Sequence, residues 1–271
     1  MATKRKAKVT RKAAVAKTKG NGKAKPPAIV TTDLFSQDAG MGVQDLKTED
    51  LAIPFLKVLQ KMSPELDDLD VRAGDIFNTV TKEGISGKDG VRVIPCAYRL
   101  EYIEWEPRGT GSGAPVNIYV AGESIPETQR GEDNKDYLVD GNGRYLERTA
   151  QHYVLVMDSD GMTQQALISM KATQFKKSKQ WNSALKSLKM KDNNGRLFTP
   201  ARFSHIWLLK SVAEENKNGS WHGWEISKDS QIEDLALYQE AKLFAESISA
   251  GQVNVQHTRE EDATESVNVP F

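Results

Sequence analysis

The chain has 271 residues, of which 38% are hydrophobic and 27% are charged, and its formal net charge is zero. Such a length accommodates one domain of about 150 to 200 residues plus tails. A single cysteine, Cys96, excludes an internal disulfide and points to a reducing compartment. No apolar run approaches the roughly 18 residues of a membrane span, and no signal peptide is recognisable, so we expect a cytoplasmic protein, in the host cytoplasm if it is viral.

The zero net charge conceals four blocks of opposite sign. Residues 1–27 carry ten Lys or Arg and no acid, whereas residues 28–160 carry thirteen against twenty-four acids. Residues 161–213 carry ten against one, and residues 214–271 carry four against twelve. Charge segregated in this way can present separate faces to an anionic polymer and to basic partners.

Residues 1–27 form a tail of Lys, Ala and Thr without an aromatic side chain. They offer too little apolar surface to offset the entropy of ordering, so we expect disorder here, and a polar connector extends this tail and linker to residue 50. A basic arm of this kind can contact nucleic acid. A solubilising or targeting leader is the alternative.

Three β-leaning segments follow. Residues 53–60 and 73–80 are short, and Pro54 suits a strand start better than a helix interior. The third segment, residues 91–105, predicts a long strand. Alternation puts Val91, Val93, Pro95 and Ala97 on one side of it, and because neither side is cleanly polar we expect both faces to be partly covered.

Residues 106–150 are acidic and rich in loops, and we interpret them as an insertion. The glycine-rich stretch 108–115 lacks the Gly-Lys-Ser/Thr ending of a phosphate-binding loop, so it reads as a flexible loop. A hairpin is predicted around residues 140–143.

The stretch from residue 149 to 227 carries the most consistent signals. It predicts a hairpin of strands 152–157 and 164–170, then a helix over 173–188 and strands over 202–212 and 221–226. Thr173 is the expected helix cap, and Asn193-Asn194-Gly195 the expected helix end. Trp181, Leu185 and Leu188 fall on one buried face of that helix.

With strand 91–105 in front, the order is β-β-β-α-β-β, the order of an OB-fold, a five-stranded, partly open barrel that binds oligonucleotides and oligosaccharides. We therefore expect a mainly β fold with some α, an OB-fold-like domain over residues 51–228 with extra N-terminal strands. A C-terminal helix over 229–251 should pack on it through Leu237, Ala241, Phe244 and Ile248, which repeat at helical spacing, before Gly251 ends the helix.

Basic side chains interleaved with rings are what a sequence-tolerant binder of single strands needs. The block 161–213 combines its ten cations with Phe175, Trp181, Phe198, Phe203 and Trp207, of which Trp181 is assigned to the core. The candidate nucleic-acid-binding residues are Lys171, Lys176, Lys177, Lys179, Lys186, Lys189, Lys191, Arg202, Phe203, Trp207, Lys210, Trp221, Trp224 and Tyr102.

Catalytic and metal-binding patterns are not found in the sequence. His152, His205, His222 and His257 are scattered, and one cysteine cannot build a zinc motif. Asp158 and Asp160 lie in an Asp-Ser-Asp-Gly turn, and no nucleophile elbow, HExxH or dinucleotide motif occurs. We expect no enzyme activity, no cofactor and no metal.

Residues 252–271 form an acidic tail that ends in Pro270-Phe271, and we expect it to be disordered. Together with the OB-like order and the basic, aromatic-bearing core, it resembles single-stranded DNA-binding proteins, whose bacterial members end in an acidic tail with Pro-Phe that docks replication and repair enzymes. The resemblance implies partner binding by Glu260, Glu261, Asp262, Glu265, Pro270 and Phe271. Here the acids stop before the last five residues, unlike the bacterial pattern. Residues 53–60 and 74–78 also resemble phage replication-module proteins.

The sequence thus predicts a phage-type, non-enzymatic single-stranded DNA-binding protein that protects replication or recombination intermediates and recruits partner enzymes through its C-terminal tip. A homo-oligomer is compatible with this role. One alternative is a virion or nucleoid structural protein that binds duplex DNA through residues 1–27, and another is a nuclease.

Overall fold

The computed structural model describes residues 32–46, 50–107, 109–110, 112–217 and 219–253, together with residues 255 and 257. Contacts divide the chain into two units, up to Asp45 and from Leu46 onward, which are described separately. In the first unit, the described residues form one helix, α1 (Thr32–Gln37), followed by turns. This helix lies where the sequence predicted an irregular connector.

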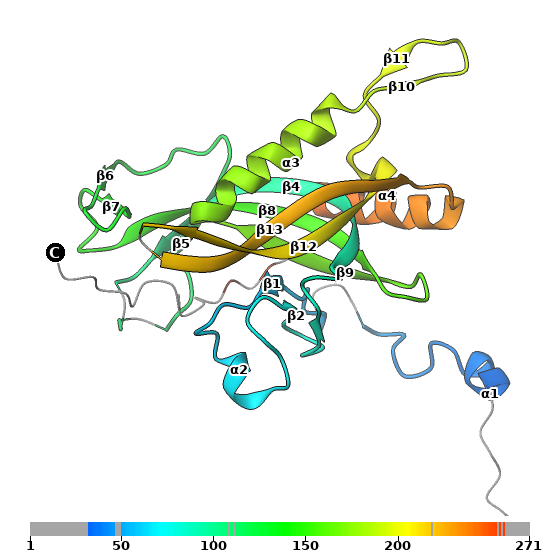
Figure 1. Cartoon of the computed structure of the whole chain (residues 1–271), viewed down its shortest axis with the longest axis horizontal. Helices are drawn as coiled ribbons and strands as arrows, with labels where there is room; N and C mark the ends of the chain where they lie inside the picture. Colours follow the sequence, from blue (N-terminus) through cyan, green and yellow to red (C-terminus); the bar gives the residue numbers. More distant parts are fainter. Residues whose placement is uncertain are drawn as a thin grey trace, which may run out of the picture. The chain divides into compact units, whose positions relative to one another are not determined.

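The second unit is built on an antiparallel sheet that curls into a half-barrel (Figure 1). Its two central strands, β4 and β8, pair along almost their whole length, and β12 and then β13 continue the sheet beyond β4. On the other side β9 and β7 pair with successive parts of β8, β6 pairs with β7, and β5 pairs with the end of β4. The strands are β4 (Val91–Trp105), β5 (Asn117–Val120), β6 (Thr128–Arg130), β7 (Asp136–Leu138), β8 (Tyr145–Met157), β9 (Thr163–Met170), β12 (His205–Asn216) and β13 (Gly219–Gln231).

Smaller elements surround this sheet. One small sheet consists of β1 (Leu56–Val58), β2 (Ile76–Asn78) and β3 (Gly84–Ile85), and a separate hairpin consists of β10 (Met190–Lys191) and β11 (Leu197–Phe198). The helices are α2 (Glu65–Asp68), α3 (Phe175–Ser187) and α4 (Leu235–Ser249), and 3-10 turns cover Ala172–Gln174 and Arg202–Ser204. The described fold is therefore mainly β with few helices, as the sequence predicted.

The predicted order of the main elements is confirmed. The strands expected at 91–105, 152–157, 164–170, 202–212 and 221–226 are β4, β8, β9, β12 and β13, with α3 between β9 and β12. The hairpin expected around residues 140–143 is also present, as β7 paired with the start of β8.

Three details of the helices differ from the prediction. Thr173 does not cap α3, because the chain enters that helix through a 3-10 turn that contains Thr173, and no side chain caps the helix start. Asn193-Asn194-Gly195 does not end the helix, which stops at Ser187; it forms the tip of the β10–β11 hairpin. The C-terminal helix starts at Leu235, later than expected, because Asp229–Gln231 continue β13.

The sheet is covered on both faces, as expected. One face holds Val93, Val154 and Leu209 against Trp181 and Leu185 of α3, and the small sheet adds Leu56 and Ile76. The other face holds Ile94, Leu155 and Leu167 against α4, whose predicted face of Ala241, Phe244 and Ile248 is buried while Leu237 is partly buried. Burial on both sides accounts for the apolar character of β4 and β8.

A β-bulge corrects the predicted alternation along β4. The pairing of β4 with β8 shifts register between Pro95 and Ala97. Val91 and Val93 pack on the α3 side as expected, whereas Ala97 packs on the α4 side with Cys96. An extra residue in one strand reverses the facing of all residues beyond it, so strict alternation fails there.

The segment before β2 connects the two ends of the curled sheet. The backbone amide of Leu167 in β9 donates to the carbonyl of Pro54 at 2.9 Å. The side chain of Gln60 donates to the carbonyl of His222 in β13 and accepts from its amide, both at 2.9 Å. These bonds satisfy edge groups of β9 and β13 that would otherwise remain unpaired.

The chain beyond α4 turns back onto the sheet. Val253 is buried with the α4 cluster, and Nε2 of His257 lies 3.2 Å from Oε2 of Glu101, where both side chains are almost inaccessible. The first residues of the expected acidic tail are thus part of the packed domain, and residues 258–271 lie outside the described part. No helix among the described residues is long and apolar enough to cross a membrane.

Candidate nucleic-acid interface

The basic arm, defined as α3 and the β10–β11 hairpin over residues 175–198, projects from the sheet (Figure 1). Its hairpin extends beyond the end of α3. Within these residues the one acid is Asp192. The exposed cations are Lys176, Lys179, Lys186, Lys189, Lys191 and Arg196.

The helical period separates the two faces of α3. Trp181 and Leu185, four residues apart, are buried against the sheet. Lys176, Lys179 and Lys186 are exposed, and their spacing of three and then seven residues places them along one side of the helix. The sequence of α3 therefore anchors the arm with apolar groups and presents ammonium groups to solvent.

The carboxylate of Asp192 is hydrogen-bonded within the turn of the hairpin. Oδ1 of Asp192 accepts hydrogen bonds from the amides of Asn194 and Arg196, at 2.8 and 2.9 Å. The amide of Gly195 donates to the carbonyl of Asp192, and Gly195 has φ +77°, which favours glycine. The carboxylate of Asp192 is thus engaged by backbone amides of its own turn.

One strand of the hairpin, β11, carries two exposed apolar side chains. Leu197 is 66% exposed and Phe198 is 43% exposed. Phe198 lies opposite Met190 and Leu197 lies opposite Lys191, so the two apolar residues are on opposite faces of the ribbon. The arm thus offers a ring and an aliphatic side chain among its cations.

Arg196 and Phe198 belong to the basic block 161–213, but the sequence alone does not single them out, or Leu197, as site residues. The Asn-Gly turn at residues 194–195 is the signal for the hairpin, and the same two residues are also typical of a helix end.

Three predicted phosphate-binding lysines have other surroundings. Lys171 pairs with Glu147 at 3.1 Å, and Lys177 pairs with Glu214 at 2.7 Å. Lys210, in β12, is half-buried. The paired ammonium groups would have to exchange a carboxylate for a phosphate, so they are weaker candidates than the exposed cations of the arm.

Arg202 is placed inside the domain, where α3 meets the sheet. Its Nη1 donates to Oδ1 of Asn182 at 2.9 Å, and its Nη2 lies 2.8 Å from Nδ1 of His152. Burial lowers the pKa of Arg202 to about 10. Both Nη groups of Arg202 thus face protein acceptors, so Arg202 is a weaker candidate for phosphate binding than the exposed cations of the arm.

Burial, with a contribution from the charge of Arg202, also lowers the pKa of His152 well below its usual value. His152 is therefore neutral, and its Nε2 is then the nitrogen that donates to the hydroxyl of Ser178, 2.8 Å away. Its ring stacks on Trp181, with centroids 4.7 Å apart. Polar groups and rings thus fix α3 to β8.

Most of the predicted stacking rings are not accessible. Trp207 and Trp224 are each 3% exposed and belong to the core on the α3 side, so they are removed from the candidate interface. Phe203 packs against Tyr238 of α4. Trp221 and Tyr102 are half-buried, and the indole of Trp221 donates to Glu214 at 2.9 Å.

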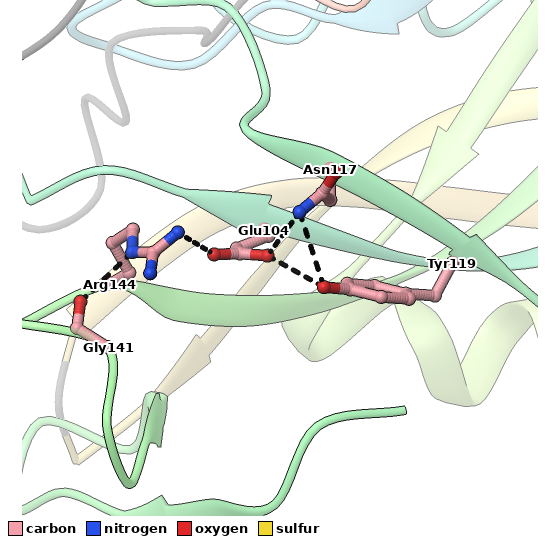
Figure 2. Close-up of polar contacts among 5 residues, drawn as sticks. All are labelled: Glu104, Asn117, Tyr119, Gly141 and Arg144. Atoms are coloured by element: carbon pink, nitrogen blue, oxygen red, sulfur yellow. Dashed lines mark hydrogen bonds and ion pairs between the residues drawn. The ribbon is translucent and has the colours of Figure 1, made fainter. Parts of the chain in front are cut away.

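A second polar cluster lies where the insertion joins β4 (Figure 2). The carboxylate of Glu104, 1% exposed, accepts from Arg144 at 2.6 Å, from the hydroxyl of Tyr119 at 2.9 Å and from Asn117 at 3.1 Å. Arg144 also donates to the carbonyl of Gly141 at 3.1 Å. Both carboxylate oxygens are satisfied, which identifies Glu104 as an anchor for the insertion, with no free group for acid–base chemistry.

No group of three or more metal-binding side chains occurs in the described part of the chain. Asp158, one of two carboxylates examined in the sequence, accepts from the amides of Asp160 and Met162, as expected for a turn. The predicted partner-binding residues Glu260, Glu261, Asp262, Glu265, Pro270 and Phe271 lie outside the described residues, as does the basic tail 1–27.

A family model of the Pam3 phage gp34-like proteins matches residues 19–254. The chain belongs to this family. It is therefore a phage protein, as the sequence predicted, and the match spans the whole sheet, the basic arm and α4. No curated protein and no solved structure matches the chain.

Proposed function

We propose that this phage protein is a non-enzymatic single-stranded DNA-binding protein that holds the phosphate backbone with its basic arm and protects replication or recombination intermediates. The observation that carries the proposal is the set of six exposed cations on the arm, whose one acid is engaged in a turn. Exposed, uncompensated cations release counterions from a nucleic acid and so generate affinity without reading sequence.

The sheet order supports the OB-like interpretation. The strands pair in the order β9-β8-β4-β12-β13, and α3 connects the third and fourth strands of the predicted barrel. OB-folds bind nucleic acid on the face of their second and third strands, here β8 and β9. Both faces of these strands are covered, by α3 and α4. The proposal therefore places the nucleic acid on the arm.

The test removes charge from the arm. The variant Lys186→Gln/Lys189→Gln/Lys191→Gln/Arg196→Gln loses four exposed cations of the arm, and Lys88→Gln/Lys217→Gln/Lys228→Gln/Lys242→Gln loses four exposed cations elsewhere. In anisotropy titrations with oligo-dT at several salt concentrations, the arm variant should lower the log-log salt slope by about 3, since each phosphate contact contributes about 0.7. Equal slopes for both variants would contradict the proposal, and metal-dependent cleavage of the DNA would point to a nuclease.

A second candidate function, duplex binding through residues 1–27 by a virion or nucleoid protein, is favoured by one observation. Burial of Trp207 and Trp224 leaves few rings for base stacking, and duplex binding needs none. Deleting residues 1–27 discriminates between the two. Our proposal expects a shallower salt slope and a retained preference for single strands, whereas complete loss of binding would favour the second candidate.

The proposal includes partner recruitment by the acidic tail. Glu260, Glu261, Asp262 and Glu265 precede Pro270-Phe271, whose ring can enter a pocket on a replication or recombination enzyme. The support for this part is the resemblance of the sequence to bacterial tails.

A further inference from the structure

The hairpin of the arm exposes apolar surface at a place where packing does not require it. Leu197 is 66% exposed and Phe198 is 43% exposed, on a ribbon whose other side chains are mostly polar or charged. Phe198 lies directly opposite Met190, which is half-buried. The Cβ atoms of such cross-strand neighbours are about 5 Å apart, so the ring of Phe198 and the thioether of Met190 form one small apolar surface.

This apolar surface is held in place by the ribbon itself. The ribbon is fixed at its tip by the Asp192 turn and at its base by Lys189, whose Nζ donates to Oγ1 of Thr199 at 2.6 Å. The hairpin extends away from the sheet (Figure 1). The hairpin therefore holds the apolar surface of Phe198 and Met190 in a fixed position where a ligand can reach it.

The cations near Leu197 and Phe198 indicate which kind of ligand the hairpin would bind. Arg196 directly precedes Leu197, the cross-strand register brings Lys191 opposite Leu197, and Lys189 adjoins Met190, the residue opposite Phe198. A ligand that matches this pattern has apolar faces inside and anionic groups outside. Nucleic acid has this arrangement, since bases stack between two lines of phosphates.

We infer that the β10–β11 hairpin is a wedge that enters the junction between single-stranded and duplex DNA, with Phe198 stacking on the terminal base pair and the flanking cations on the phosphates. The inference rests on the proposed function and adds a preference for junctions to it. Apolar side chains such as Phe and Leu insert between base steps in proteins that unstack DNA, and two-stranded ribbons fit into a DNA groove. A junction requires the least unstacking, because its last pair already has one open face.

The test compares a forked duplex, carrying 2-aminopurine at the last paired position, with a single strand of the same length. The full-length protein should bind the fork more tightly than the single strand and should raise the fluorescence of 2-aminopurine. Phe198→Ala should lower the ratio of fork to single-strand affinity by roughly fivefold or more, the lower end of what one stacked base contributes, and should abolish the fluorescence rise.

Matched variants provide the controls. Leu197→Ala, which removes the apolar side chain on the opposite face of the ribbon from Phe198, should leave the ratio unchanged, as should Leu243→Ala, which removes an equally exposed leucine from α4. Because Leu197 and Leu243 are both 66% exposed, neither change should perturb the fold. Circular dichroism and thermal unfolding verify that point.

Two outcomes would overturn the inference while leaving the proposed function intact. If Phe198→Ala weakens fork and single-strand binding equally, the ring stacks on bases without any junction preference. If it changes neither affinity while the arm-cation variant does, Phe198 does not contact the DNA. A full-length protein that binds no single strand would instead overturn the proposed function, and the wedge with it.

Discussion

Nη2 of Arg202 lies 2.8 Å from Nδ1 of His152, and its Nη1 donates to the uncharged side chain of Asn182 at 2.9 Å. The guanidinium also lies over the rings of Tyr98 and Trp181, each about 5.7 Å away. Hydrogen bonds and rings hold this cation at the base of the arm.

We expect Arg202→Lys to destabilise the domain by about 1 to 3 kcal/mol. A lysine ammonium cannot reproduce the planar pair of donors to Asn182 and His152, so a buried acceptor loses its partner. Denaturant unfolding measures the change. Arg196→Lys, at an exposed position, should change the unfolding free energy by less than about 0.5 kcal/mol, and equal effects of the two changes would contradict this account of Arg202.

The buried histidines should make stability depend on pH. The folded-state pKa of His152 is far below the usual 6.5, and burial followed by the charge of Lys228 also lowers that of His205. Below pH 6.5 the unfolded chain therefore binds protons that the folded chain excludes, so stability falls as the pH falls from about 6.5. Each histidine contributes at most about 1.4 kcal/mol per pH unit.

Denaturant unfolding of the wild type at pH 7 and pH 5 checks this dependence. His152→Gln should reduce the difference in unfolding free energy between the two pH values, although it also lowers stability at both. If the unfolding free energies at pH 7 and pH 5 differ by the same amount in the variant and the wild type, protonation of His152 does not contribute to the pH dependence of stability.

We expect Glu104→Gln to cost about 1 to 3 kcal/mol of folding free energy. The change removes charge-assisted hydrogen bonds at the buried Glu104 position, while the guanidinium of Arg144, whose side chain is 30% exposed, stays partly hydrated. Thermal and denaturant unfolding measure it. Glu106→Gln, two residues further along, is the control, and DNA affinity at a temperature where the variant is folded should not change, because the insertion is separate from the arm.

Phe271→Ala should abolish capture of replication or recombination enzymes and leave DNA affinity nearly unchanged. One buried Phe contributes roughly 1.5 to 3 kcal/mol to a docking contact, which decides a micromolar interaction but does not involve phosphate. Pull-downs from infected cells compare the wild type with the variant. Deleting residues 259–271 should abolish capture and also raise DNA affinity at low salt, because four acids are removed. Recovery of the same partners by wild type and Phe271→Ala would leave the tail without a docking role.

The main elements could be predicted from sequence because local signals were strong there. The strand 91–105 and the face of α4 formed by Ala241, Phe244 and Ile248 follow from periodicity and are present as expected. Periodicity failed at Pro95 and Ala97, since a bulge is a property of the pairing with β8 rather than of β4 alone. The link from Gln60 to His222 spans 162 positions and leaves no local signal.

The candidate site was predicted only in part, because the sequence indicates which charged residues are exposed but not which aromatic rings are. Lys176, Lys179 and Lys186 of α3 were expected at the surface and are exposed, because charge strongly disfavours burial. Rings carry no such restriction, so the sequence did not distinguish Trp207 and Trp224, which are in the core, from Phe198, which is exposed. Leu197 and Phe198 follow the Asn194-Gly195 turn signal, which is also typical of a helix end. Only their pairing with Lys191 and Met190 in the structure identifies the hairpin.

The central claim is that the basic arm binds single-stranded DNA, and one salt-dependent titration tests it most directly. Anisotropy of labelled oligo-dT is the suitable readout, because Trp181, Trp207 and Trp224 are buried and their fluorescence reports poorly on a surface ligand. The account expects tighter binding to oligo-dT than to a duplex of equal length, with a log-log salt slope to which six arm cations contribute up to about 4. Equal or tighter binding to the duplex would contradict it.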